Sequence, residues 1–304
     1  MTIHTLFSEV EDVSGHILPH EHIFCDFTPI TGDLDHLLND KVVALRELSY
    51  FEQVGGSVIV DITPPDLGRQ PKLLAEIAHK TNLKIVMSTG WYRKAFYPKE
   101  IDTLSSSRLA QIVISELTHG IELENGEIVK AGIIGEIGVD RDIVSAQEER
   151  VLRAAAIASC ETGAPISTHS SMYPVGIKQL EILKEYPIAP NKIVVGHADT
   201  YLDEDYHKEL LDAGCYIQFD TIGRNHMNSD ADRVSSILNL VALGYQDQIL
   251  LSTDRCFRSD LKTFGGFGYD YLFVTFKELL MNAGLPEEIF TIFTNKNAIA
   301  ALSW

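Results

Sequence analysis

Short apolar segments alternate with longer amphipathic segments along most of the chain. Eight of the apolar segments are too short for helices, are rich in Val and Ile, and lack strict alternation, which is typical of strands covered on both faces. These segments are residues 16–24, 57–63, 84–90, 131–138, 164–170, 192–198, 215–221 and 248–254. We therefore expect eight buried strands.

The amphipathic stretches between these segments predict helices, the clearest at residues 35–54, 70–81, 148–162 and 230–244. Eight alternating units fit either a closed (β/α)₈ barrel or a doubly wound open sheet. No glycine-rich phosphate-binding fingerprint follows the first strand, and the count of eight favours an α/β TIM barrel. No linker or shift in composition divides the chain, so residues 1–304 are expected to form one domain.

Three long irregular segments follow the third, seventh and eighth predicted strands, at residues 90–102, 224–230 and 255–268. Barrel enzymes build their active sites from the loops at the carboxyl ends of the strands. These three segments are therefore expected to cover the active-site pocket.

Composition narrows the classes of partner. The chain of 304 residues carries 43 acidic and 25 basic residues, a formal net charge of −18, which argues against nucleic acid as a partner. A local cationic pocket for a small anionic substrate remains compatible with this balance. The sequence shows no secretory signal and no apolar run long enough to span a membrane, and its four cysteines form no CxxC pair. We expect a reduced, cytoplasmic protein without a membrane partner.

Residues able to bind a metal ion gather at the ends of the predicted strands. His20 and His22 stand two positions apart in the first strand, so both side chains should point to the same side. His169 and His197 end the fifth and sixth strands, and Asp254 ends the eighth. Neutral imidazole is a preferred ligand of zinc and similar ions.

Taken singly, most of these residues have a structural explanation. The histidines could be satisfied polar residues, and Asp254 could cap the turn that follows its strand. Glu136 is harder to explain, because an acid among apolar residues of a buried strand is costly unless it is paired or bound to a cation. All six residues end strands of one predicted barrel, so they should meet at its rim and form a centre for two metal ions.

The same residues resemble a known family. The HEH motif at residues 20–22, the acid on strand 4, the histidines on strands 5 and 6 and the aspartate on strand 8 are similar to the phosphotriesterase-related group of the amidohydrolase superfamily. The resemblance includes the segments GWYRKAFYP, KAGIIGEIG, PISTHSS, CYIQFDTIG and GGFGYDYL, and runs from about His16 to the C-terminus.

The resemblance implies a binuclear hydrolase. It places His20, His22 and Asp254 on one ion and His169 and His197 on the other, with Glu136 bridging the two. Family members that hydrolyse organophosphate triesters, and lactonases close to them, carry a carboxylated lysine at the bridge. Glu136 supplies the same bridging geometry without needing carbon dioxide. This difference from the triester hydrolases weakens the expectation that the protein hydrolyses organophosphate triesters.

Two such ions would lower the pKa of a shared water towards about 7, producing a hydroxide that attacks an ester or a lactone. Asp254 would accept the proton of this hydroxide and pass it to the leaving group. The ligand set suits Zn²⁺, with Mn²⁺ as the alternative.

Substrate contacts are expected from the loops. The resemblance places Tyr92 beside the ions, where its hydroxyl would donate to the substrate oxygen; the alternative is an aromatic lid that packs on Trp91. Arg224 and Arg258 would clamp an anionic group, unless they are instead paired with Asp230 or Asp260.

We hypothesise a metal-dependent hydrolase of carboxylic esters or lactones, including phosphorylated sugar lactones. One alternative is a phosphoesterase, and another is a non-catalytic metal-binding barrel. The apolar C-terminal segment at residues 289–304 should pack on the barrel or on a partner, and the sequence allows a homodimer.

Overall fold

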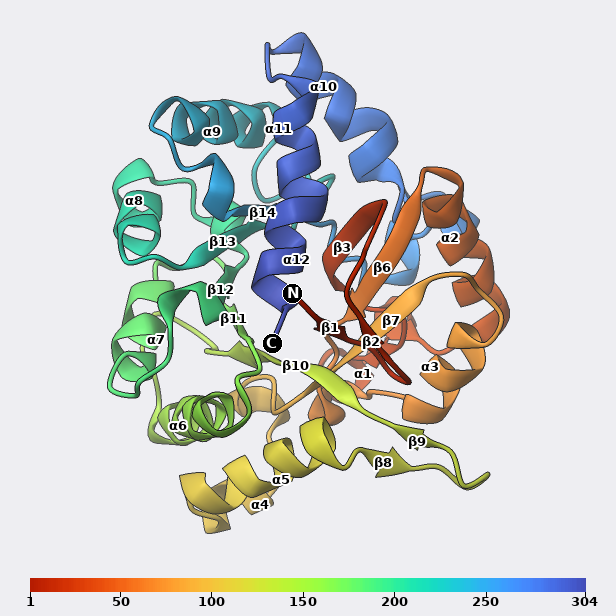
Figure 1. The fold of residues 1–304 in the computed structure, drawn as a ribbon, viewed down its shortest axis with the longest axis vertical. Coiled ribbons are helices and arrows are strands. Elements are labelled where there is room, and N and C mark those ends of the chain that lie inside the picture. Colours follow the sequence, from red (N-terminus) through yellow and green to blue (C-terminus); the bar gives the residue numbers. More distant parts are fainter.

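The centre of the protein is a ring of eight parallel strands surrounded by helices (Figure 1). The computed structural model describes residues 1–304. In the order in which they neighbour one another, the strands are β3 (His16–Glu21), β6 (Gly56–Asp61), β7 (Lys84–Thr89), β10 (Ala131–Gly138), β11 (Ile166–His169), β12 (Ile193–Gly196), β13 (Tyr216–Phe219) and β14 (Ile249–Leu251). All eight predicted strands and the predicted TIM barrel are confirmed.

The ring closes between β14 and β3 through a side chain. The Ser252 hydroxyl donates to the carbonyl of His20 at 2.9 Å and accepts from the backbone N–H of the same residue at 3.1 Å. The backbone N–H of Asp254 also donates to the His20 carbonyl at 3.3 Å. The first and last strands are therefore fixed to each other beside two predicted metal ligands.

Helices cover the outside of the ring. The long ones are α2 (Lys41–Gln53), α3 (Pro71–Ala78), α5 (Ser106–Thr118), α6 (Ala146–Thr162), α7 (Gly176–Leu183), α8 (Glu204–Asp212) and α9 (Asp230–Ala242). Shorter ones are α1 (Thr28–Thr31), α4 (Glu100–Thr103), α10 (Lys277–Asn282), α11 (Glu287–Thr291) and α12 (Asn297–Leu302). The helices predicted at residues 70–81, 148–162 and 230–244 are confirmed. None of the helices combines the length and the apolar character that a membrane span requires.

The prediction of one helix over residues 35–54 is wrong in its first part. Leu37–Leu38 form a short strand, β5, which pairs with β4 (Cys25–Asp26). The helix begins only at Lys41, because the Asp40 carboxylate accepts hydrogen bonds from the N–H groups of Val42 and Val43 and so caps the helix. Pairing with a distant segment thus overrides the local helical pattern.

Two apolar cores hold the barrel together. The larger one joins the strands to the surrounding helices, and the smaller one joins strand residues to the two ends of the chain. The smaller core includes Ile17, Val58 and Val194 from the strands, and Ile3 and Leu302 from the two ends of the chain. The apolar C-terminal segment therefore packs on the barrel, one of its two predicted destinations.

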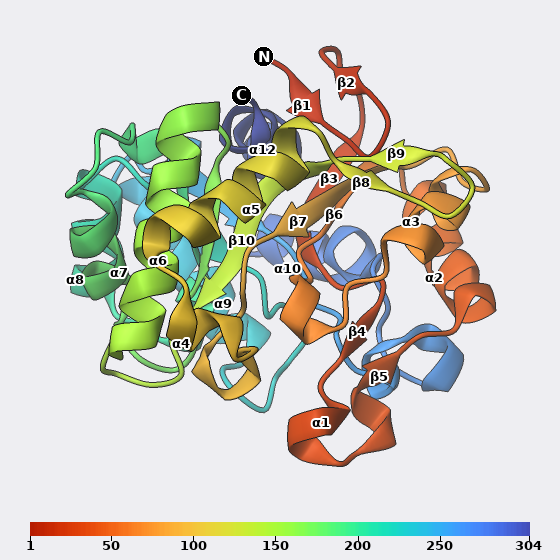
Figure 2. The same ribbon diagram turned by 90° about the horizontal axis from the view of Figure 1, so that it is seen from below.

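The two ends of the barrel differ in what covers them. The N- and C-termini lie together at one end, whereas α1, β4 and β5 lie at the other end (Figure 2). At the terminal end, β1 (Ile3–His4) pairs with β2 (Glu9–Val10), and Ile3 also bridges to Ser303. A further hairpin, β8 (Ile121–Glu122) and β9 (Ile128–Val129), precedes β10. The opposite end, where the strands finish, is left to the loops.

Candidate metal centre and active site

Six side chains meet where the strands end, and Glu136 lies among them. Its Oε2 atom is 2.9 Å from Nδ1 of His169 and 3.2 Å from Nε2 of His197. Its Oε1 atom is 3.6 Å from Nε2 of His22, and Oε2 is 3.5 Å from Nε2 of His20. A single buried carboxylate thus faces four imidazoles.

Asp254 completes the cluster on the side of the first strand. Its Oδ1 atom is 3.3 Å from Nε2 of His22 and 3.7 Å from Nε2 of His20. In each of two groups of three residues, the ligand atoms all lie within 4.8 Å of one another. One group is His20, His22 and Asp254, and the other is His20, Glu136 and His197. The family resemblance assigns the residues differently, with His20 on one ion only and His169 beside His197 on the other.

The residues fit a pair of divalent ions. His20 is fully buried and neither of its ring nitrogens makes a hydrogen bond, although Oδ2 of Asp220 lies 3.3 Å from Nδ1. A buried imidazole without partners is costly, and a cation at Nε2 would remove that cost. Neutral imidazole nitrogen and carboxylate oxygen are ligand atoms that suit Zn²⁺, and Mn²⁺ also binds to them. We therefore regard all six side chains as candidate ligands.

The backbone is held in unusual conformations at two of these residues. His197 and Asp254 have φ angles of 56° and 48°, in the left-handed region that side chains other than glycine rarely adopt. The N–H of His197 donates to both carboxylate oxygens of Asp220, and the carbonyl of Asp254 accepts from Arg224. Such strain is found where the surrounding structure enforces it, as it does at functional sites.

Electrostatics keep the acids of the cluster ionised. Burial raises the pKa of the Glu136 carboxyl, but His169, His197 and His20 outweigh burial and hold this pKa well below its ordinary value. Burial likewise raises the pKa of Asp254, and Arg224 and His22 reverse the effect. Both carboxylates are therefore charged at neutral pH, as metal ligands must be.

The imidazole of His169 is neutral at neutral pH. Burial lowers its pKa to about 4, and the adjacent Glu136 carboxylate opposes this effect only in part. The Tyr92 ring packs edge-on against His169, with ring centroids 4.9 Å apart and an interplanar angle of 79°. Tyr92 also contacts Phe27 and Phe96, and it lines the cavity above the cluster. The structure thus brings Tyr92 to the site.

The cavity above the cluster has a volume of about 380 Å³. The three loops singled out in the sequence contribute Tyr92, Arg93, Arg224, His226, Met227, Cys256 and Phe257 to its wall. The loops after β3 and β11, which the sequence did not single out, contribute Phe27, Thr31, His36, Ser171, Met172 and Tyr173. Asp140, in the loop after β10, also lines the cavity, so six loops cover it rather than three.

Arg224 lies in this cavity but is already paired. Its guanidinium is 2.9 Å from Oδ2 of Asp254 and 2.9 Å from Oδ2 of Asp260, and it also contacts the Cys256 sulfur at 3.0 Å. The pairing with Asp260 is the alternative that the sequence left open. Arg224 therefore fixes Asp254 from the side opposite the histidines.

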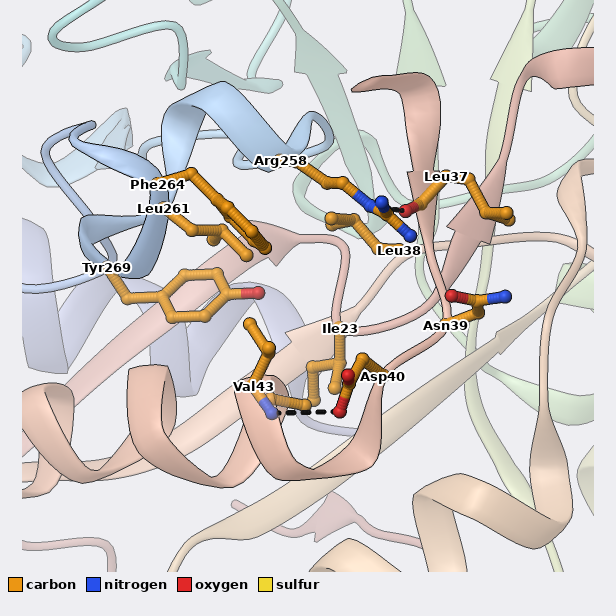
Figure 3. Close-up of a pocket in the computed structure, with 11 residues that line it drawn as sticks. Ile23, Leu37, Leu38, Asn39, Asp40, Val43, Arg258, Leu261, Phe264 and Tyr269 are labelled. Carbon is orange, nitrogen blue, oxygen red and sulfur yellow. Dashed lines mark hydrogen bonds between the residues drawn. The ribbon is translucent and has the colours of Figure 1, made fainter. Parts of the chain in front are cut away.

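Arg258 lies elsewhere. It lines a separate, mostly apolar cavity of about 230 Å³, where its Nε atom donates to the carbonyl of Leu37 at 2.9 Å (Figure 3). The walls of this cavity include Ile23, Leu261 and Tyr269. The structure therefore does not bring the two predicted substrate arginines together.

Two buried acids beside the cluster were missed in the sequence. Glu21 points away from the histidines and accepts hydrogen bonds from the hydroxyl of Ser252 and from the N–H groups of Thr253 and Arg255. Asp220 directly follows β13 and contacts His197. The signal that singled out Asp254, an acid directly after an apolar strand, was also present at Asp220.

The barrel and the cluster at the carboxyl ends of its strands define a class of protein, the metal-dependent barrel hydrolases. A model of the phosphotriesterase family matches residues 1–298. The chain therefore belongs to the phosphotriesterase family, and the predicted resemblance is confirmed.

Individual relatives cover nearly the whole chain. The phosphotriesterase homology protein of Escherichia coli is 34% identical over 94% of this chain and 97% of its own length. Its crystal structure, with phosphate in the active site, has a TM-score of 0.93, covers 96% of this chain and 100% of that chain, and is 33% identical. An N-acetyltaurine hydrolase from Rattus norvegicus is 30% identical over 86% of this chain and 77% of its own length. The structure of a lactonase from Listeria monocytogenes has a TM-score of 0.91, with 27% identity over 100% of this chain and 99% of that chain.

Proposed function

We propose that this protein hydrolyses carboxylic esters or lactones at a centre of two divalent ions held by His20, His22, Glu136, His169, His197 and Asp254. The observation that carries this proposal is the position of Glu136, whose two carboxylate oxygens lie within 3.6 Å of nitrogens of four histidines. When bound, such ions lower the pKa of a shared water towards about 7 and polarise the oxygen of the bond that is cleaved.

The residues of the chain supply proton transfer and orientation. Oδ1 of Asp254 faces the histidines, while Oδ2 is held by Arg224. We infer that Oδ1 receives the proton of the attacking water and passes it to the leaving oxygen. The Tyr92 hydroxyl, on the wall of the same cavity, would donate to the substrate oxygen.

A phosphorylated sugar lactone remains one of the proposed substrates, but Arg224 and Arg258 no longer support it. Arg224 already pairs with two carboxylates, and Arg258 lines the other cavity. An anionic group would instead meet Arg93, which lines the active-site cavity and lies 3.2 Å from Asp140. The phosphate in the E. coli relative favours a second candidate, the phosphoesterase. Zinc is the expected ion, with manganese as the alternative.

The test is hydrolysis by protein reconstituted with zinc or with manganese. The substrates are plain lactones, phosphorylated lactones, aryl phosphate esters and, because of the rat relative, N-acetyltaurine. We expect lactone cleavage that is lost in Asp254→Asn. Cleavage of phosphate esters alone would replace the lactone proposal with the phosphoesterase. A metal-loaded protein that cleaves nothing, and in which Asp254→Asn changes only metal content, would be a non-catalytic barrel.

A further inference from the structure

The Asp220 carboxylate faces two of the candidate ligands at once. Its Oδ1 atom accepts from Nδ1 of His197 at 2.7 Å, and its Oδ2 atom lies 3.3 Å from Nδ1 of His20, a charge contact rather than a hydrogen bond. Asp220 is fully buried, and the other hydrogen bonds to its carboxylate come from the backbone N–H of His197, at 3.1 and 3.0 Å. The family resemblance assigns these two histidines to different ions, so one acid lies behind both halves of the centre.

A carboxylate at Nδ1 determines which nitrogen of a neutral imidazole carries the proton. A charged carboxylate only accepts hydrogen bonds, so the proton stays on Nδ1 and the lone pair stays on Nε2. Both Nε2 atoms face Oε2 of Glu136. This oxygen lies 3.2 Å from Nε2 of His197 and 3.5 Å from Nε2 of His20. The arrangement thus turns both lone pairs towards the place where the ions would lie.

Neither a lysine nor an arginine pairs with Asp220. Its neighbour Asp199 is paired with the buried Arg233, whose Nε atom lies 2.6 Å from Oδ2 of Asp199. The backbone N–H of Asp220 donates to Asp199 at 3.2 Å, which fixes the position of the residue. An ionised acid in the interior is costly unless it is paired, and the imidazoles are the groups that can pair with Asp220.

A glycine packs beside this contact. Gly196 lies at the end of β12, and a Cβ atom there would come within 3.4 Å of Oδ2 of Asp220 and 3.5 Å of the His20 ring. It would also lie 2.4 Å from the Thr168 carbonyl, which is closer than side chains approach. The Thr168 carbonyl therefore requires glycine at this position, whereas the distances to Asp220 and His20 are ordinary van der Waals contacts.

We propose that Asp220 is a positioning residue that holds the proton on Nδ1 of both His20 and His197, and so presents their Nε2 atoms to the two ions. This inference rests on the metal centre of the proposed function. It concerns how the ligands are oriented and does not depend on which substrate is cleaved.

The test is the zinc affinity of Asp220→Asn, measured by competition with a chromophoric chelator. The amide keeps the shape of the side chain, but only its oxygen accepts a hydrogen bond, so its NH₂ group must face one of the two imidazoles. Loss of a carboxylate behind a ligating histidine weakens metal binding by roughly 10- to 100-fold. We expect a weakening in that range for the ion whose histidine faces the NH₂ group, with two ions still bound at saturating zinc.

Asp230→Asn is the matched control. Asp230 is a buried acid of the same region that accepts from Arg233, Gly223 and Tyr271 and contacts no histidine. We expect it to change stability but to leave zinc affinity within about twofold. If zinc affinity and melting temperature fall equally in both variants, Asp220 is merely structural and the inference is overturned.

Two outcomes separate this inference from the proposed function. A wild-type protein that binds no pair of ions overturns both, whereas tight binding of two ions by a folded Asp220→Asn overturns the inference alone. Should Asp220→Asn fail to fold, ¹⁵N NMR of the zinc-loaded wild type reports the histidine tautomers. We expect both rings to be protonated on Nδ1, and protonation of His20 or His197 on Nε2 would refute the assignment.

Discussion

At the scale of single residues, Glu136 carries the most weight. It lies near the carboxyl end of β10, is 1% exposed, and has no lysine or arginine as a partner. Its neighbours are four imidazoles, and an acid so placed needs positive charge from protons or from metal ions. The sequence identified this residue because the other seven residues of the strand are apolar or glycine.

We expect Glu136→Gln to lose both metal equivalents together, because this residue alone would join the two ions. The measurement is metal content by plasma emission spectrometry after dialysis. Glu47→Gln is the control, since Glu47 is also fully buried but accepts from Lys262 and Thr263, far along the chain from the histidines. Retention of two ions by Glu136→Gln would show that the bridge is misassigned.

Asp66 provides a pH prediction at the same scale. Both oxygens of its carboxylate accept from the backbone N–H of Tyr92 at 3.0 Å, and burial raises its pKa to about 7. The folded state therefore holds a proton that the unfolded chain releases near pH 3.8. The contribution of Asp66 to the free energy of unfolding is therefore complete below pH 3.8 and is lost as the pH rises from 3.8 to about 7.

Replacement by asparagine should remove this loss, because the amide oxygen can still accept from Tyr92 and carries no charge. We expect Asp66→Asn and wild type to melt at similar temperatures at pH 4, and the variant to melt higher at pH 8. Calorimetry across this range checks the prediction. A difference that is constant with pH would mean that Asp66 is ionised throughout.

At the scale of elements, the loops after β13 and β14 act as one unit. Arg224 of the first loop pairs with Asp254 and Asp260 of the second, and its guanidinium lies over the Phe257 ring. The sequence suggested that Arg224 and Arg258 reach an anionic substrate together. Which acids lie opposite an arginine depends on how two loops fold against each other, and no local pattern contains that information.

We expect Arg224→Met to lower the free energy of unfolding by about 3–5 kcal/mol, because the buried Asp254 and the partly buried Asp260 would lose their partner. It should reduce turnover of neutral and anionic substrates alike. Arg258→Met should leave the KM of anionic substrates unchanged, since this side chain is outside the cavity. Urea unfolding and KM for a matched pair of substrates provide the check. A rise in KM for the anionic substrate alone, in either variant, would show that the replaced arginine binds the anionic group of the substrate after all.

At the scale of the whole molecule, the barrel separates stability from chemistry. The chain ends close the amino end of the ring, where the Trp304 indole donates to the Gly132 carbonyl at 2.9 Å and stacks on His4 at 3.8 Å. The metal cluster lies at the carboxyl ends of the same strands. Such a division lets the loops vary without disturbing the core.

Truncation of Trp304 to alanine should therefore destabilise the protein and spare the site. We expect a loss of about 2 kcal/mol, less than for a fully buried tryptophan, because Trp304 is only partly buried. Thermal unfolding and zinc titration of the same sample provide the measurements. A weakened zinc affinity in a folded Trp304→Ala would show that the two ends of the barrel are coupled.

The sequence by itself determined the barrel and the positions of its six candidate ligands, because both depend on repetition. Eight buried strands have a regular pattern, and parallel strands bring their carboxyl ends to one rim. Tertiary structure alone decided the contacts between segments. It paired Leu37–Leu38 with Cys25–Asp26, gave Arg224 to Asp254, and placed Asp220 behind two histidines. Such contacts join residues far apart in the chain, and their energies depend on distance and burial, which periodicity does not encode.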